Sequence, residues 1–313
     1  MNINTIFLVI LLLLTGCHQI KNHENMSKSG YVNVKEGKLH YQSYGSGEPI
    51  IVIHGGPGMM DSSYLIPEMR ELAKQNQVIF YDQRGSGKSL ATVVNSKLIN
   101  LEQFTRDLDD LRKNLKLDKV ILLGHSWGGL IAMNYAAKYP QHLNKLILLS
   151  TAPADYQGIM EFEKKSEEKT KNIAREIAPL YTSQTIAKLD IEEIKRLYSK
   201  VFEFYVYKAN DAKKITLGFD KKSAVSTVQA MEELAKDSWN NPDFNLFPKL
   251  KNIKAPTLII HGKEDIIPLW TIQKIKDVIP NAKELYIDDC GHFPHVEQKE
   301  RTLDAIAKFS IYS

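Results

Sequence analysis

One serine is placed where a nucleophile would be useful. The apolar run 120–123 is followed by Gly124-His125-Ser126-Trp127-Gly128 and then by a segment with helical spacing. A G-x-S-x-G sequence between a buried strand and a helix is typical of the tight turn that exposes a nucleophilic serine. The start of the helix also favours a developing negative charge. The sequence therefore predicts Ser126 as a nucleophile, and a purely structural turn is the alternative.

A serine hydroxyl is a poor nucleophile unless a neighbouring base takes its proton. In folds that use this turn, the acid and then the histidine follow the serine along the chain. Asp265 comes just after the apolar run 257–260, and His292 comes after the run 285–287. We therefore predict His292 as the general base and Asp265 as the acid that orients it. The rival acids are Glu264, Asp288 and Asp289, and the rival bases are His125, His261 and His295.

A third stretch offers hydrogen-bond donors for an oxyanion. The apolar run 51–53 is followed by His54-Gly55-Gly56-Pro57-Gly58, where glycines leave the backbone open to a substrate. Acyl transfer needs such donors, and the loss of one can cost about 3 kcal/mol. We predict the backbone N–H groups of Gly56 and Trp127 as the two donors. A Gly-Pro turn without a catalytic part is the alternative.

The elements that would carry these residues alternate between strands and helices. Short apolar runs, read as strands buried on both faces, alternate with segments of helical spacing, which indicates an α/β fold with a doubly wound, mostly parallel sheet. The alternation stops between Thr151 and Phe247, where only helical and polar segments occur. We predict a core over residues 30–152 and 248–313 and a helical cap over residues 153–247. Ligands bind such sheets beyond the carboxyl ends of the strands.

The first residues have a different character. Ile6 to Leu14 is an unbroken apolar run, too short to span a bilayer but typical of a signal peptide. Leu14-Thr15-Gly16-Cys17 resembles the lipobox of bacterial lipoproteins. We expect residues 1–16 to be removed, Cys17 to carry a lipid, and residues 17–29 to form a flexible tether. The protein would then be exported and anchored to a membrane of the cell envelope. A buried strand or an uncleaved anchor is the alternative.

The composition narrows the function classes. The chain has 313 residues, of which 43% are hydrophobic, and a formal charge of +4. Such a small excess of charge gives no reason to expect a nucleic-acid partner. With Cys17 lipidated, Cys290 would have no partner for an intramolecular disulfide, and nothing in the sequence indicates an oligomeric state.

Three motifs together resemble the proline iminopeptidase family of α/β-hydrolases. They are 54–58 (HGGPG), 82–89 (DQRGSGKS) and 124–129 (GHSWGG), and the resemblance covers about residues 31–151 and 250–309. It implies an enzyme that removes an N-terminal residue, commonly proline, from short peptides, without metal or cofactor. In such enzymes acidic residues of the cap receive the substrate ammonium group, and here Glu203 and Glu232 are the candidates.

Several alternatives stay open at this point. Glu233 stands beside Glu232 and could take its place. A carboxylesterase or lactonase would use the same three residues on another small-molecule substrate, and a ligand-binding protein could keep the fold without turnover. For Asp82 and Arg84, we expect a structural role in tying neighbouring turns together rather than a part in the chemistry.

Overall fold

The computed structural model describes residues 26–56, 61–90, 95 and 97–312. The predicted signal peptide, Cys17, and Pro57 and Gly58 of the glycine-rich turn lie outside the described residues. Among the residues that are described, no helix is both long and apolar enough to cross a bilayer.

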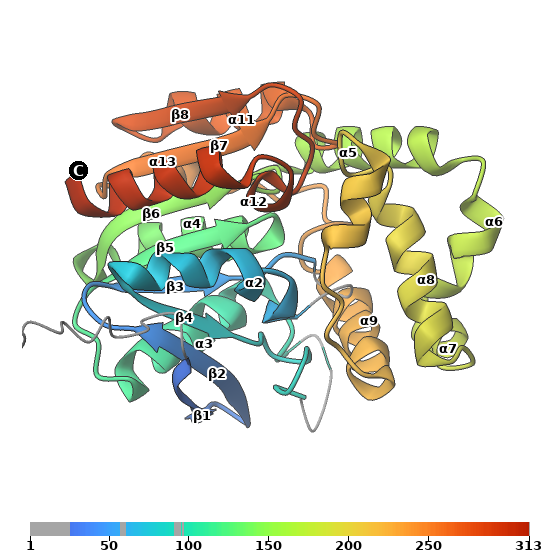
Figure 1. Ribbon diagram of the computed structural model, residues 1–313, viewed down its shortest axis with the longest axis horizontal. Coiled ribbons are helices and arrows are strands. Elements are labelled where there is room, and N and C mark those ends of the chain that lie inside the picture. Colours follow the sequence, from blue (N-terminus) through green and yellow to red (C-terminus); the bar gives the residue numbers. More distant parts are fainter. Residues whose placement is uncertain (1–25, 57–60, 91–94, 96, 313) are drawn as a thin grey trace, which may run out of the picture.

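Eight strands form one sheet in the order β1-β2-β4-β3-β5-β6-β7-β8 (Figure 1). The first two pairings are antiparallel, and every other neighbouring pair is parallel. Each strand from β3 to β8 overlaps one of the short apolar runs in the sequence, so the predicted fold class is confirmed. The strands are β1 (Met26–Val34), β2 (Gly37–Gly45), β3 (Pro49–Ile53), β4 (Gln77–Tyr81), β5 (Val120–His125), β6 (Leu143–Leu149), β7 (Thr257–Gly262) and β8 (Ala282–Ile287).

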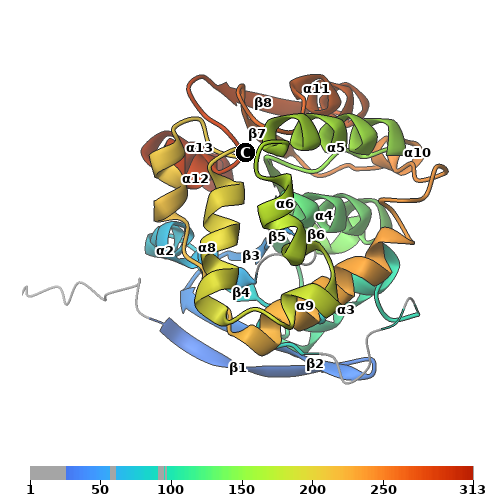
Figure 2. The same cartoon turned by 90° about the vertical axis from the view of Figure 1, so that its right-hand side faces the viewer.

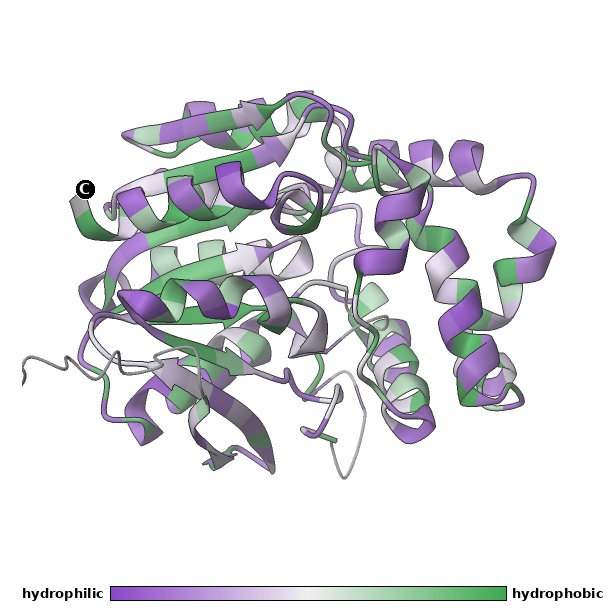
Figure 3. Cartoon of the chain, in the orientation of Figure 1, coloured by the Kyte–Doolittle hydropathy of each residue, from purple (hydrophilic) through white to green (hydrophobic). Residues whose placement is uncertain are grey.

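Helices cover both faces of this sheet, which explains the continuous apolar runs of the central strands. In Figures 1 and 2, α2, α12 and α13 lie on one face, and α3, α4 and α11 lie on the other. Every residue of β5 is buried, and Figure 3 shows the central strands as the most hydrophobic part of the chain. These helices are α2 (Ile66–Met69), α3 (Leu101–Asn114), α4 (Trp127–Lys138), α11 (Leu269–Val278), α12 (Pro294–Glu297) and α13 (Lys299–Tyr312), with short 3₁₀ turns η2 (Ser62–Tyr64), η3 (Arg70–Lys74) and η4 (Pro140–His142).

Residues 150–256, all of which the structure describes, contain helices and no strand beyond one isolated bridge. This insertion lies over the carboxyl ends of the parallel strands (Figure 1); below we call it the cap. Its longest helices each begin after an aspartate whose side chain accepts a backbone N–H from the first turn, which is the usual way to start a helix. The helices are α5 (Tyr156–Thr170), α6 (Ala174–Ile177), η5 (Ala178–Tyr181), α7 (Ser183–Ile186), α8 (Ile191–Phe202), η6 (Ala209–Lys214), α9 (Lys221–Ala235) and α10 (Phe247–Leu250).

Two expectations about these segments need correction. The predicted tether was to end at residue 29, but β1 already begins at Met26, because Lys28 and Ser29 pair with β2. All of residues 26–29 are exposed, so this first part of the edge strand carries no hydrophobic signal in the sequence. The sequence also has amphipathic helical spacing over 160–177, which predicts one helix, but α5 ends at Thr170 and the separate helix α6 buries Ile177 in the cap.

A buried ion pair ties the loop after β4 to α3. The guanidinium of Arg84 donates to both carboxylate oxygens of Asp107 over 2.8 Å, and it also donates to the carbonyls of Lys35 and Glu36 in the first hairpin. Arg84 and Asp107 are both almost fully buried. This arrangement is the tie between turns that the sequence suggested for Arg84.

We expect Asp107→Ala to lower the free energy of unfolding by about 3–5 kcal/mol, because it leaves a buried guanidinium without a counter-charge. Urea denaturation measures the change. Asp304→Ala is the matched control, since it removes a carboxylate from an exposed pair with Lys308 that is worth about 1 kcal/mol or less. Equal losses in the two variants would contradict this reading of Arg84.

Candidate active site

Ser126 occupies the turn between β5 and α4 in a strained backbone conformation. Its φ is +53° and its ψ is −122°, a region that residues with a side chain seldom adopt. A Cβ on Gly124 would collide with the carbonyl of Gly128, and one on Gly128 would collide with the carbonyl of Ile53. The glycines of the motif are therefore required by close backbone packing, which presents the Ser126 side chain to the cavity above the sheet.

The structure brings Ser126, His292 and Asp265 together. The Nε2 of His292 lies 3.0 Å from the Oγ of Ser126, and its Nδ1 lies 2.9 and 3.1 Å from the two carboxylate oxygens of Asp265. A carboxylate only accepts hydrogen bonds, so Nδ1 carries the proton. The free Nε2 then accepts the hydroxyl of Ser126, as a general base must.

Asp265 is held as a charged group beneath the histidine. It is fully buried, and its Oδ1 also accepts the backbone N–H of Ile267 over 2.9 Å. Burial alone would raise the pKa of Asp265, but the neighbouring His292 and His261 and these hydrogen bonds lower it to about 2. The carboxylate therefore stays ionised and fixes the tautomer and the orientation of His292.

The loop that carries His292 is fixed through its backbone N–H groups. Glu264 accepts the N–H of Cys290 over 3.0 Å, and Glu297 accepts those of Gly291 and Phe293 over 2.9 Å. The N–H of His292 itself donates to the carbonyl of Tyr205 in the cap over 2.7 Å. Glu264, the first rival acid, thus anchors this loop.

In the described hydrogen bonds, none of the remaining rivals contacts the hydroxyl of Ser126, which is bonded by His292. Asp288 is exposed and paired with Lys263, and neither it nor Asp289 contacts His292 in the described hydrogen bonds. His261 and His295 are completely buried, and His125 bonds the hydroxyl of Tyr64 and the carbonyl of His292. Burial and the nearby His292 and His295 lower the pKa of His125 well below its usual range. It stays neutral, in a supporting position.

The two predicted oxyanion donors line the same cavity as Ser126. Trp127 is the first residue of α4, so its N–H has no acceptor within the helix. Gly56 has a φ of +54°, and a Cβ on the preceding Gly55 would come within 2.8 Å of the Cβ of Ser126. The glycine-rich turn therefore lies directly against Ser126.

The cavity has a volume of about 1060 Å³ and lies between the strand ends and the cap. Apolar and aromatic side chains form much of its wall: Tyr64, Trp127, Phe162, Ile177, Tyr181, Val201, Phe202, Tyr205, Met231, Leu234, Trp239, Ile267 and Phe293. Its charged lining residues are Glu163, Glu167, Glu232 and Lys171. Among the described residues, no group of three or more potential metal ligands is arranged to hold an ion.

Of the two cap glutamates predicted from the sequence to bind the substrate, only one lies at the cavity. Glu232 lines the cavity, and its oxygens accept the N–H and the hydroxyl of Ser183 over 2.8 and 2.9 Å. Glu203 is exposed at the end of α8 and is not a cavity residue, because Val201 and Phe202 occupy the inward positions of that turn. The assignment of Glu203 to the substrate site is therefore wrong.

Sequence reasoning missed Glu163 and Glu167 on α5. They belong to a run of alternating lysines and glutamates, a pattern that favours a solvated helix face, yet both line the cavity. Their spacing of four residues places them on one side of the helix, which was the available signal. Burial, with a contribution from Glu167, raises the pKa of Glu163. Glu233, the alternative to Glu232, pairs with Lys236 and does not line the cavity.

Comparisons with known proteins agree with this fold. A family model described as alpha/beta hydrolase fold matches residues 48–299. A proline iminopeptidase from Heyndrickxia coagulans is 27% identical over 299 residues, which cover 91% of this chain and 99% of the relative. An alpha/beta fold family hydrolase from Bacillus anthracis superposes with a TM-score of 0.73 at 20% identity, covering 92% of this chain and all of the other. An esterase from Exiguobacterium antarcticum gives 0.67 at 19% identity, covering 90% and 99%.

We expect Asp265→Asn to lower kcat by about 10⁴-fold, because an amide favours the wrong tautomer of the base. Circular dichroism should stay unchanged, and steady-state rates on an aryl ester measure the effect. Glu264→Gln is the matched control, since Glu264 lies one position away and bonds only the loop backbone. If Glu264→Gln lost as much activity as Asp265→Asn, the acid role would have to be reassigned.

Proposed function

The chain belongs to the alpha/beta hydrolase fold family, and from this premise we propose that it is a serine hydrolase that releases N-terminal residues from short peptides. The observation that carries the proposal is the continuous contact from Ser126 through His292 to Asp265 beside two open backbone N–H groups. The similarity to proline iminopeptidases along 91% of the chain favours peptides as the substrate class.

In the proposed reaction, the Oγ of Ser126 attacks the substrate carbonyl carbon while its proton moves to the Nε2 of His292. The N–H groups of Gly56 and Trp127 receive the developing oxyanion. His292 then gives the proton to the leaving nitrogen, the C–N bond breaks, and an ester between Ser126 and the acyl group remains. A water molecule then gives a proton to the Nε2 of His292 and attacks this ester. The amino acid is released, and His292 returns the proton to Ser126.

Recognition of a free amino terminus would come from the acidic side of the cavity. Three glutamates and one lysine give this part of the wall a net negative charge. Glu163 makes no ion pair among the described residues, and a substrate ammonium beside it would offset its partial burial. Both oxygens of Glu232 already accept hydrogen bonds from Ser183, which orients them. We therefore assign the ammonium contact to Glu163 and Glu232.

A carboxylesterase or lactonase is the second candidate, and one observation favours it. The cavity is several times larger than a prolyl residue and much of its wall is apolar, which suits an acyl chain as well as a peptide. An ester would use the same acyl-enzyme chemistry but would gain nothing from the glutamates.

Comparing substrates with a free and a blocked amine separates the two candidates. We expect a prolyl or alanyl arylamide to be cleaved faster than its N-acetyl form, and Glu163→Gln to raise KM for the free amine about tenfold or more, since a hydrogen bond to a charged group is worth about 1.5–3 kcal/mol. Glu203→Gln, the exposed control, should change neither value. Equal rates with and without the free amine, together with fast ester cleavage, would support the esterase instead.

We further propose that Cys17 anchors the protein to a membrane of the cell envelope as an exported lipoprotein. The apolar run 6–14 and the lipobox-like segment 14–17 support this proposal. Each methylene of an acyl chain that enters the bilayer adds about 0.8 kcal/mol, so several chains on one cysteine would hold the enzyme firmly.

We expect Cys17→Ser to abolish the incorporation of an alkyne fatty acid and to move the protein out of the membrane fraction. In-gel fluorescence of labelled cells measures the incorporation, and an immunoblot of the membrane and soluble fractions measures the location of the protein. Cys290→Ser is the control, because Cys290 is the other cysteine and is buried in the loop that carries His292. This variant should keep the label. Label that persists after Cys17→Ser would overturn the anchor.

A further inference from the structure

The loop after β4 contains a buried glutamine that no step of the reaction uses. Gln83 is only 2% exposed and stands between two residues next to the nucleophile, His54 at the end of β3 and Trp127 at the start of α4. Its neighbour Arg84 has the structural contacts described above, and its neighbour Asp82 accepts hydrogen bonds from the backbone N–H groups of Ser62 and Lys88. Gln83 instead bonds His54, which adjoins one half of the proposed oxyanion site, and Trp127, which forms the other half.

The first half is the peptide between Gly55 and Gly56. The Nδ1 of His54 donates to the carbonyl of Gly55 over 2.8 Å, since a carbonyl only accepts. In a planar trans peptide the carbonyl and the following N–H point in opposite directions, so this bond directs the N–H of Gly56 away from His54. The N–H of Gly55 is held separately by the hydroxyl of Tyr64 over 2.7 Å.

Gln83 fixes His54 at two points. The backbone N–H of Gln83 donates to the Nε2 of His54 over 3.0 Å, and its side-chain amide donates to the carbonyl of His54 over 2.6 Å. The hydroxyl of Ser86 lies 3.1 Å from the same Nε2 and donates to the carbonyl of Gln83. Burial lowers the pKa of His54 against the opposing effects of Gly55 and Asp82, which keeps the ring in the neutral form that this pattern requires.

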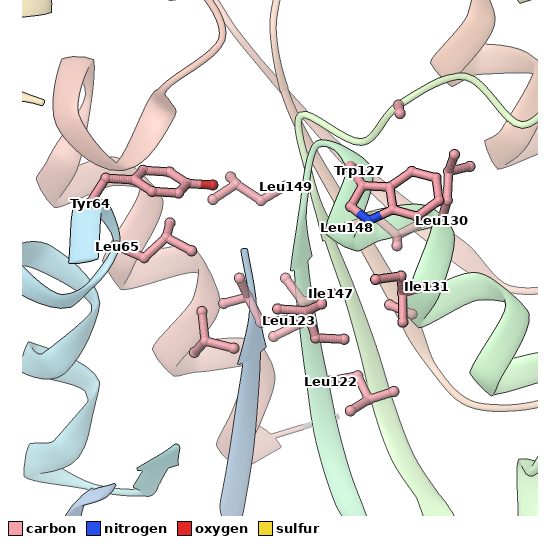
Figure 4. Packing of buried hydrophobic residues seen from close by; sticks show 14 of the residues in the cluster. Tyr64, Leu65, Leu122, Leu123, Trp127, Leu130, Ile131, Ile147, Leu148 and Leu149 are labelled. Atoms are coloured by element: carbon pink, nitrogen blue, oxygen red, sulfur yellow. The ribbon is translucent and has the colours of Figure 1, made fainter. Parts of the chain in front are cut away.

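The second half is Trp127. Its indole Nε1 donates to the side-chain oxygen of Gln83 over 3.1 Å. The two ends of one amide group therefore hold the end of β3 and the first residue of α4 at a fixed spacing. Figure 4 shows Trp127 across the central strands from Tyr64, whose hydroxyl points inward toward them.

We propose that Gln83 is the positioning residue of the oxyanion site, and that it sets the direction of the Gly56 N–H through His54 and the place of the Trp127 N–H through the indole. The inference rests on the proposed hydrolase reaction but not on the choice between peptide and ester. Oxyanion donors act only at about 2.7–3.1 Å from the oxygen of the tetrahedral intermediate. A shift of the two donors relative to each other therefore weakens binding of the transition state more than binding of the substrate.

Gln83→Met tests this role, because methionine is similar in length but makes neither hydrogen bond. On p-nitrophenyl acetate we expect kcat to fall by about 10–100-fold, part of the 10²–10³ that one donor contributes, with KM within about twofold. The affinity for a trifluoromethyl ketone, which forms a tetrahedral adduct with Ser126, should fall by the same factor. Gln103→Met is the matched control: Gln103 is equally buried and bonds Asp107, away from both donors. It should change stability alone.

Trp127→Phe provides a second test that keeps the amide. It removes the indole donor and keeps the backbone N–H at position 127 and an aromatic ring in its place, so we expect a smaller loss of kcat. The double variant should be no slower than Gln83→Met, because the two changes break the same link.

The outcomes separate this inference from the proposed function. Losses of kcat that are equal for Gln83→Met and Gln103→Met, or a loss confined to KM, would overturn the positioning role while leaving the hydrolase intact. Additive losses in the double variant would also overturn it. A wild-type enzyme that hydrolyses neither ester nor arylamide would overturn the proposed function and this inference together.

Discussion

The strained backbone of Ser126 is the constraint on which the rest of the site depends. Its positive φ persists because the parallel strands β3, β5 and β6 and the helix α4 meet there with no space for a side chain on Gly124 or Gly128. Such strain costs of order 1–3 kcal/mol and survives only where the surrounding structure imposes it. The buried apolar sheet supplies that rigidity. As a result, Ser126 and Trp127, the first residue of α4, both line the cavity.

The two other loops of the site are positioned relative to this turn by polar contacts. The loop that carries His292 is held by Glu264 and Glu297, and Glu297 also accepts the N–H of Tyr207 in the cap over 2.7 Å. The turn that carries Gly56 is held by His54, Tyr64 and Gln83. The cap therefore bears on catalysis in two ways, since it encloses the substrate cavity and its segment after α8 supports the histidine.

The sheet and the turn that carries Ser126 could be predicted because the constraints on them act on residues that are close together in the sequence. Strands buried on both faces must be apolar along their whole length, and a nucleophile turn needs glycines at fixed positions, so both leave a readable pattern. The carboxyl ends of parallel strands meet at one edge, which brought Asp265 and His292 to Ser126. The contacts of Gln83 join residues 29 and 44 positions apart, and no spacing rule reveals such bonds.

The cap was the part that the sequence described least well. The orientation of the cap helices decides which of their side chains line the cavity, and the sequence does not give that orientation. Glu203 was therefore assigned to the site although it is exposed, and Glu163 was overlooked although it lines the cavity. The edge strand at Met26 gave no signal because its stabilisation comes from pairing with β2 rather than from burial. Each miss occurs where tertiary contacts decide the structure.

The central claim is that His292 and Asp265 activate the hydroxyl of Ser126. The most direct measurement is to expose the protein briefly to an alkyl fluorophosphonate, a reagent that reacts preferentially with an activated serine. Mass spectrometry of the intact protein and of its peptides then counts and locates the adducts. We predict one adduct per chain, on Ser126, and almost none in His292→Ala. An unlabelled wild-type protein, or an adduct on another serine, would contradict the account.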